Sequence, residues 1–320
     1  PLSVPPLPAL LARFARPRGP EALPATFDRR RVYVLPTRFG LFFATLLLVM
    51  TLGALNYNNN PAFLLALLLV GAGIASLVAA QLQLSGLAIT AVDAEPVPAG
   101  QPLVVRVHAR APADRQRSGL LVRALPDAGA SVDARLHLAQ GFGEAALPLG
   151  TTRRGWFDVP RLRVSTTRPL GLALAWAYAW PTLPLLVYPQ PERDPPPLPV
   201  GSGDAAQARL HPAGDDVHHL RAYRAGDPRR AIAWKHSARR DQLLVREYEQ
   251  PLGADVLLDW PATRGLAHEA RIARLAAWVD AAERDGRRYR LRVPGIDLGP
   301  AHGAAHRHAC LRALALMPGG

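Results

Sequence analysis

The chain has 320 residues, of which 38 are Lys or Arg and 25 are Asp or Glu, so its formal net charge is +13. This length allows two compact domains, and the positive charge favours an anionic partner or an anionic membrane surface. The single cysteine, Cys310, excludes an internal disulfide and a cysteine-rich metal cluster. Only Lys235 is a lysine, so the arginine content also reflects a coding preference and is weak support for a binding surface.

Residues 1–38 are rich in proline and arginine with little periodicity, which predicts a basic tail. Two uncharged apolar runs follow, Phe39–Leu55 and Pro61–Ala80, separated by a short polar turn. Each approaches the roughly 20 residues needed to cross a bilayer. Their apolar character continues all round, which favours membrane helices over the alternative of a buried helical pair in a soluble core. We therefore expect residues 39–80 to form a two-helix transmembrane hairpin in the lipid bilayer.

Arginines are concentrated before the first apolar run, whereas the turn at residues 56–60 has no charge. The positive-inside rule then predicts a cytoplasmic tail and a turn on the opposite side of the membrane. A hairpin returns the chain, so everything after Ala80 is expected in the cytoplasm. The arginines concerned are Arg13, Arg16, Arg18, Arg29, Arg30, Arg31 and Arg38.

Short alternating runs follow, separated by Pro, Gly, Asp or Ser. This pattern predicts an all-β, immunoglobulin-like sandwich over residues 84–190. A Pro/Gly-rich stretch at residues 191–204 is then expected to be a linker between domains. The clearest predicted strands are Leu103–Arg110, Gly119–Leu125, Ala134–Gln140 and Arg161–Thr167.

Strand and helix patterns alternate in residues 205–320, which predicts an α/β domain with a mostly parallel sheet. An amphipathic helix is expected to end near Gly286, because Ile272, Leu275, Ala276 and Val279 have helical spacing. A second helix is expected over Ala304–Met317. The predicted strands are Leu243–Glu249, Ala254–Trp260 and Arg287–Val293.

Common sequence motifs for phosphate loops, serine hydrolases and zinc peptidases do not occur. The strand at Ala254–Trp260 ends in D-x-P-x-T, with Asp259 and Thr263 at the outer positions. A magnesium site of the form D-x-S-x-S needs an oxygen at all three positions, and Pro261 has none in its side chain. We therefore predict a degenerate metal site that binds no metal.

Other candidate groups have simpler explanations. His302, His306 and His308 lack a neighbouring carboxylate or cysteine at ligand spacing, so surface histidines are favoured over a metal site. Cys310 lies among Ala and Leu residues of a predicted helix, which favours a small core residue over a nucleophile.

The densest charge lies at residues 221–249, where acids are interleaved with the basic residues. Nucleic-acid binding would favour segregated basic residues with stacking aromatics, so it is disfavoured here. Interleaved positive and negative residues indicate intramolecular Arg–carboxylate pairs or a partner-docking surface.

The sequence R-x-Y-x-x-G-D-P-R-R-x-I-x-W-K-x-S-A-R, followed by L-L-V-R-E-Y-E, resembles the signature of the domain of unknown function 58 family. Ala233 stands where the family has an Asp. The resemblance implies a truncated von Willebrand A-like α/β domain and a bacterial inner-membrane protein that works with a MoxR-type AAA+ ATPase. The signature residues are Arg221, Tyr223, Arg224, Gly226, Asp227, Arg229, Arg230, Trp234, Lys235, Ser237, Arg239, Arg246 and Glu247.

The apolar runs and this resemblance together imply a non-enzymatic adaptor in the bacterial inner membrane, without a cofactor. By the resemblance, it would help the ATPase to assemble or mature client proteins. The basic signature residues would dock the ATPase or its client. Two alternatives stay open: an enzyme of envelope or polysaccharide metabolism, and a protein that binds anionic lipid or nucleic acid.

Overall fold

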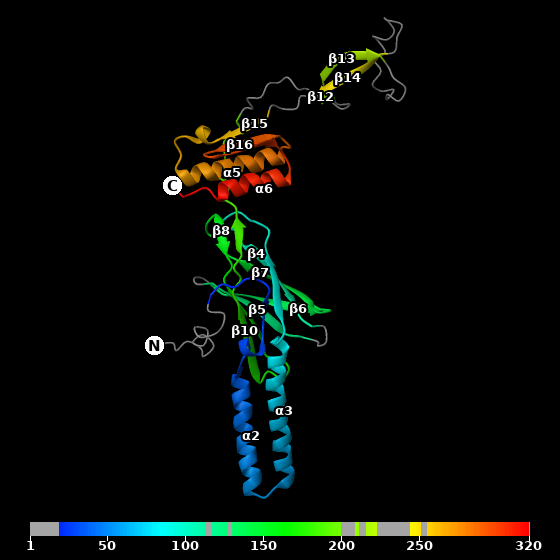
Figure 1. Cartoon of the computed structure of the whole chain (residues 1–320), viewed down its shortest axis with the longest axis vertical. Coiled ribbons are helices and arrows are strands. Elements are labelled where there is room, and N and C mark those ends of the chain that lie inside the picture. The colour runs from blue at the N-terminus through cyan, green and yellow to red at the C-terminus, as the bar shows by residue number, and fades with distance from the viewer. Residues whose placement is uncertain are drawn as a thin grey trace. The chain divides into compact units, whose positions relative to one another are not determined.

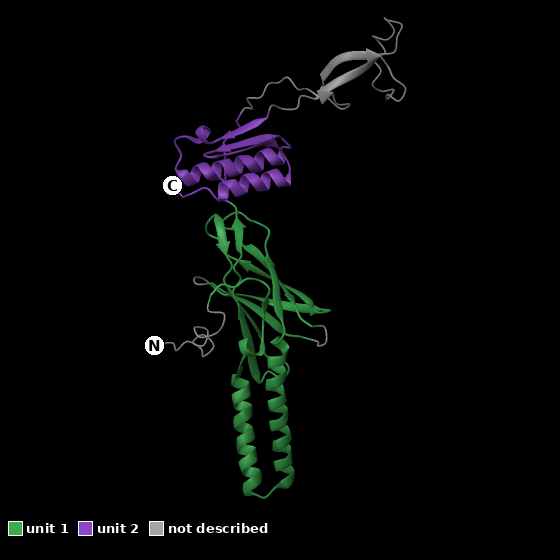
Figure 2. Ribbon diagram, in the orientation of Figure 1, with its two compact units in different colours: residues 1–188 green, residues 189–320 purple. Residues whose placement is uncertain are grey.

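The structure is a computed structural model that describes residues 19–112, 117–126, 130–199 and 255–319, together with the backbone of residues 209–210, 216–222 and 244–250. The chain forms two compact units, Pro1–Tyr188 and Pro189–Gly320 (Figure 2).

Two long helices form the predicted hairpin: α2 at Arg38–Asn56 and α3 at Asn60–Leu84 (Figure 1). Both are long and apolar enough to cross a membrane. Each begins at a side-chain cap, because Thr37 Oγ1 accepts from Gly40 N at 3.0 Å and Asn59 Oδ1 accepts from Ala62 N at 3.1 Å. Only 17% and 11% of their most apolar stretches are buried, so these helices do not have the environment of core helices in a soluble protein.

A nine-stranded antiparallel sheet makes up most of the rest of the first unit, in the order β1-β3-β4-β7-β6-β5-β9-β10-β2. Its strands are β1 (Ala25–Thr26), β2 (Tyr33–Pro36), β3 (Ala88–Asp93), β4 (Leu103–Arg110), β5 (Leu120–Leu125), β6 (Val132–Ala139), β7 (Phe142–Leu149), β9 (Arg161–Thr166) and β10 (Ala173–Ala179). A short helix, η1 (Arg29–Arg31), lies between the first two strands. Strands β8 (Gly155–Asp158) and β11 (Pro184–Val187) pair separately.

Residues 25–36, assigned by sequence reasoning to the tail, instead contribute β1 and β2 to this sheet. Their partners are far away in the chain, since Ala25 pairs with Ile89 and Pro36 with Ala173. The short apolar run of β2 therefore gains partners that the local sequence does not reveal.

Strand β6 lets the sheet curl around one core. Residues 132–136 of β6 pair with β5, whereas residues 137–139 pair with β7. Apolar side chains from both halves of the curled sheet, such as Val105 and Val164, share one buried cluster. Leu84 at the end of α3 belongs to the same cluster, so the hairpin and the sheet share a core.

The start of α2 and the end of α3 are each tied by hydrogen bonds to loops that lead into the sheet. Thr37, before α2, donates from Oγ1 to Gly171 O at 2.6 Å and from its amide to Leu172 O at 2.9 Å. After α3, the Arg117 guanidinium donates to the carbonyls of Gln83 and Ser85, both at 2.9 Å. The two Arg117 bonds satisfy backbone carbonyls that the C-terminal end of α3 leaves without intrahelical partners.

The described part of the second unit has a small α/β layer, built from β15 (Val256–Asp259), η3 (Trp260–Thr263), α5 (His268–Arg284), β16 (Tyr289–Val293), β17 (Ile296–Ala301) and α6 (Ala304–Ala315). Strand β15 pairs with β16 in parallel, and β16 pairs with β17 antiparallel. The sheet in these residues is therefore mixed, whereas a mostly parallel sheet was expected. The antiparallel strand β17 was not predicted. Its Gly299 and Pro300 resemble a turn in the sequence.

Residues 189–199 pack on α5, although most of this stretch was expected to be a free linker. The amide of Glu192 donates to Ala273 O at 3.0 Å, and Trp278 Nε1 donates to Pro196 O at 2.9 Å. Prolines lack an amide donor but keep their carbonyl acceptor, which explains how a proline-rich segment attaches to a helix.

Three further strands, β12 (Arg209–Leu210), β13 (Asp216–Ala222) and β14 (Leu244–Gln250), pair antiparallel in the order β12-β14-β13. The predicted strand Leu243–Glu249 coincides closely with β14.

Candidate functional site

The predicted signature is only partly within the described backbone. Arg221 lies in β13, opposite Val245, and Arg246 and Glu247 lie in β14 opposite Leu220 and His219. The other ten signature residues lie outside the described residues: Tyr223, Arg224, Gly226, Asp227, Arg229, Arg230, Trp234, Lys235, Ser237 and Arg239.

Asp259 and Thr263 lie where sequence reasoning expects them, at the carboxyl end of the parallel strand β15 and in the following turn. Asp259 Oδ1 is buried and has no hydrogen-bond partner in the structure. Thr263 is buried, and its Oγ1 donates to Trp260 O at 2.8 Å.

A guanidinium group occupies the space next to Thr263. Arg271 of α5 donates from Nε to Thr263 Oγ1 at 3.0 Å and from a terminal nitrogen to Trp260 O at 2.6 Å. Its Cζ also lies 3.8 Å from the centre of the Trp260 ring. The Thr263 hydroxyl thus already accepts a hydrogen bond from a cation, which makes it a poor ligand for a second one.

Cys310 and His306 of α6 lie together beside β16. Cys310 is fully buried, and burial, followed by the charge of Glu283, raises its pKa to about 12. His306 Nε2 lies 3.0 Å from Tyr289 O and 3.6 Å from the Cys310 sulfur. Within the described ranges, no group of three or more His, Cys, Asp or Glu residues is placed to hold a metal ion.

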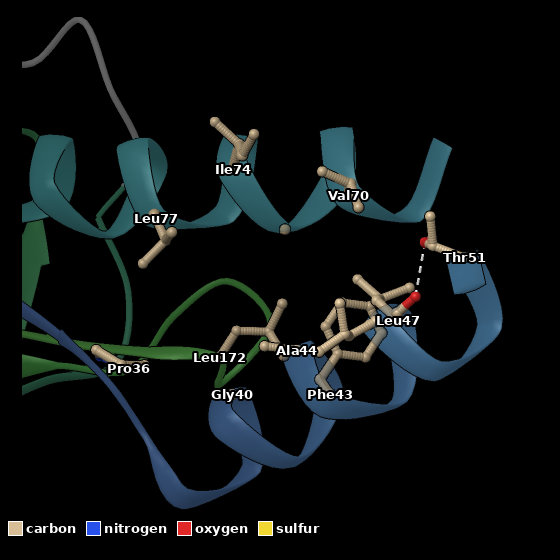
Figure 3. A pocket seen from close by; sticks show the side chains of 12 residues that line it. Pro36, Gly40, Phe43, Ala44, Leu47, Thr51, Val70, Ile74, Leu77 and Leu172 are labelled. Carbon is tan, nitrogen blue, oxygen red and sulfur yellow. Dashed lines mark hydrogen bonds between the residues drawn. The ribbon is translucent and has the colours of Figure 1, made fainter. Parts of the chain in front are cut away.

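A groove of about 400 Å³ lies between the two long helices and is almost wholly apolar. Figure 3 shows Phe43 and Leu47 of α2, Val70 and Leu77 of α3, and Leu172 of the sheet domain around it. Since lipid chains are apolar, this groove fits the membrane environment expected for the helices.

Sequence reasoning missed a second cavity, of about 420 Å³, on the outward face of β5, β6, β9 and β10. Its lining combines leucine side chains with charged and hydroxyl groups. The main polar residues are Arg123, Arg135, His137, Arg163, Ser165 and Thr167.

Cross-strand register gathers these arginines. Arg123 of β5 lies directly opposite Arg163 of β9 on one side and Asp133 of β6 on the other. Arg123 makes a bidentate ion pair with Asp133, which holds the pKa of that carboxyl below its usual range. Burial, followed by the charge of Arg123, lowers the pKa of Arg163. Basic residues at alternate positions, Arg161 and Arg163 in β9 and Arg135 and His137 in β6, are the sequence signal for this face. The register that joins the two strands is not readable from the sequence.

No protein family, curated protein or solved structure matches the chain. The resemblance of residues 221–249 to the domain of unknown function 58 family therefore stays a prediction.

Proposed function

We propose that the chain is a membrane-anchored adaptor that works with a MoxR-type AAA+ ATPase on client proteins. The observation that carries the anchoring is the pair of long apolar helices whose side chains are largely exposed, such as Leu48 at 60% and Leu68 at 69%. Exposed side chains of this kind are stable in lipid, whereas water would oppose them.

In this proposal the anchor lies in the bacterial inner membrane, and both units are cytoplasmic, as the arginines before α2 favour. The curled sheet serves as an immunoglobulin-like domain, and the second unit as a partial von Willebrand A-like domain. The signature residues dock the partner. The guanidinium of Arg271 beside Thr263 supports docking that does not use a metal ion at Asp259 and Thr263. The alternative of an envelope enzyme rests on signature-region acids and histidines whose side chains are not described.

Co-purification tests the adaptor. The detergent-solubilised chain is expected to retain the MoxR-type ATPase encoded by the same bacterium, and a nucleotide is expected to change the retained amount. The double variant Arg229→Glu/Arg230→Glu removes two signature charges and should abolish retention.

The matched control is Arg264→Glu/Arg284→Glu, which changes two exposed arginines of the second unit outside the signature. This control should retain the ATPase. Equal losses in both double variants, or no retention by the unaltered chain at low salt, would contradict the proposal.

A further inference from the structure

The arginine cavity has more positive charge than its neighbours neutralise. Arg123, Arg135 and Arg163 line it, and Asp133 is the carboxylate paired with Arg123. Arg135 is exposed and makes no salt bridge with a described residue. Like charges directly opposite each other, as in Arg123 and Arg163, destabilise a sheet. A bound anion would offset this repulsion, so two opposed arginines that line a cavity indicate an anion site.

Neighbouring charges do not remove this excess. Arg161, on the same strand as Arg163, lies over the Tyr178 ring at 4.1 Å. Glu144 lies opposite His137 in the sheet, but its carboxylate is 3.7 Å from Arg106 Nε on the next strand. Asp133 therefore remains the acid that contacts the cavity arginines among the described ion pairs.

The lining also has hydroxyl and ring donors that suit phosphate. Ser165 lies near the end of β9, Thr167 follows that strand, and His137 lies on β6. Arginine binds phosphate oxygens in a bidentate manner, and hydroxyl groups add further hydrogen bonds. A volume of about 420 Å³ admits a phosphate with part of its substituent.

The rim of the cavity is joined to both membrane-helix ends. The carbonyl of Thr167 accepts from Gly171 N at 2.8 Å, and Gly171 O accepts from Thr37, the cap of α2. On the other side, Gly119 follows two residues after Arg117, which holds the carbonyls at the end of α3. The cavity thus lies at the level where the proposed membrane helices emerge, which is where lipid phosphates are found.

We propose that this arginine cavity binds a phosphate group, and that its source is the headgroup of an anionic phospholipid. This site is separate from the signature, so it goes beyond the adaptor proposal. Bound lipid would fix the sheet domain to the membrane surface, and each arginine would add to the attraction of an anionic leaflet.

Titration of the full-length, detergent-solubilised chain with short-chain phosphatidylglycerol tests the proposal, with short-chain phosphatidylcholine and inorganic phosphate as separate arms. We expect phosphatidylglycerol to bind most tightly. The variant Arg135→Gln/Arg163→Gln should weaken its binding by roughly tenfold or more, since charged hydrogen bonds are lost. The matched control Arg106→Gln/Arg110→Gln removes two charges from β4, outside the cavity, and should bind as the unaltered chain does.

Each other outcome overturns part of the proposal. Equal affinity for phosphatidylcholine, or an equal loss in the control, would overturn the phosphate site. If inorganic phosphate binds as tightly as phosphatidylglycerol, the phosphate site stands and its lipid source is wrong. If the double variant does not fold, the single variant Arg135→Gln, at an exposed residue, replaces it in the titration. Unchanged affinity of that variant for phosphatidylglycerol overturns the site. If the chain does not retain the ATPase but still binds phosphatidylglycerol, only the adaptor proposal is contradicted.

Discussion

Gly40, in the first turn of α2, lies directly against the backbone carbonyl of Leu172. A Cβ atom added to Gly40 would be 1.9 Å from Leu172 O, and the obstacle is backbone rather than a flexible side chain. The close approach lets Thr37 bond to the carbonyls of both Gly171 and Leu172. Glycine is therefore required where the first helix meets the sheet.

Gly40→Ala is expected to destabilise the first unit by about 1–3 kcal/mol, because the helix or the strand must shift to admit the methyl group. Gly71→Ala is the matched control, since a Cβ there meets nothing within 4 Å. Thermal unfolding in detergent, followed by circular dichroism, measures both. Equal unfolding temperatures for the two variants would show that the contact with Leu172 is unimportant.

Acid should weaken the attachment of residues 189–199 to α5. Glu192 and Arg274 form a bidentate ion pair with distances of 2.7 and 2.8 Å, and the hydrogen bond from Arg274 lowers the pKa of Glu192. A lowered folded-state pKa stabilises the fold above the ordinary glutamate value of about 4.3, and this contribution is lost as the pH falls through the folded value. For a partly exposed pair the contribution is at most about 1 kcal/mol.

Hydrogen exchange of α5 measured by mass spectrometry tests this pair. Glu192→Gln should speed exchange in α5 at neutral pH, and the ratio between the variant and the unaltered chain should approach one at acid pH. Asp285→Asn, which neutralises an exposed carboxylate at the end of α5, should leave that ratio near one throughout. A ratio for Glu192→Gln that is independent of pH would contradict the assigned role of the carboxylate.

Magnesium should not stabilise the second unit. Pro261 has no side-chain oxygen, and Thr263 Oγ1 already accepts from Arg271, so the D-x-P-x-T turn lacks the ligands that the ion requires. The unfolding temperature of the full chain should be the same with MgCl2 and with EDTA. A rise with magnesium that Asp259→Asn abolishes would show that a metal site exists.

Arg271→Ala should destabilise the second unit by about 2 kcal/mol, because it removes two hydrogen bonds and the contact with the Trp260 ring. Thermal unfolding measures the loss. Arg264→Ala, an exposed arginine in the same turn region, is the control and should have little effect. If both variants lose similar stability, the loss comes from removing a positive charge, and the role assigned to the Arg271 contacts is contradicted.

Cys310 should be inert in the folded chain. Its side chain is fully buried and its pKa is about 12, so the reactive thiolate is scarce at neutral pH. Iodoacetamide should alkylate it only after unfolding, and intact-mass measurement is unambiguous because the chain has no other cysteine. Rapid alkylation of the folded protein would contradict the burial.

Local patterns predicted the local elements well. The apolar runs Phe39–Leu55 and Pro61–Ala80 lie within α2 and α3, and β4 has its predicted bounds. Each of these elements has a continuous or alternating pattern that is complete in the sequence itself.

Elements that depend on distant partners were not predicted. Strand β2 is held by β10, more than a hundred residues later, and β17 contains a Gly-Pro pair that is typical of a turn. The arginine cavity needs the register between β5, β6 and β9, which no single strand reveals. Asp259 lies at the end of its predicted strand, but the residue that bonds to Thr263, Arg271, comes from a helix whose packing the sequence leaves open.

The bonds of Thr37 and Arg117 have a mechanical consequence. A domain on a single flexible tether can rotate freely above a bilayer, but this sheet is held at the start of α2 and at the end of α3. Because both attachments are hydrogen-bonded, the sheet and the helix ends are expected to move together. In the proposed membrane setting, a change of helix tilt with bilayer thickness would therefore change the orientation of the sheet domain relative to the membrane plane.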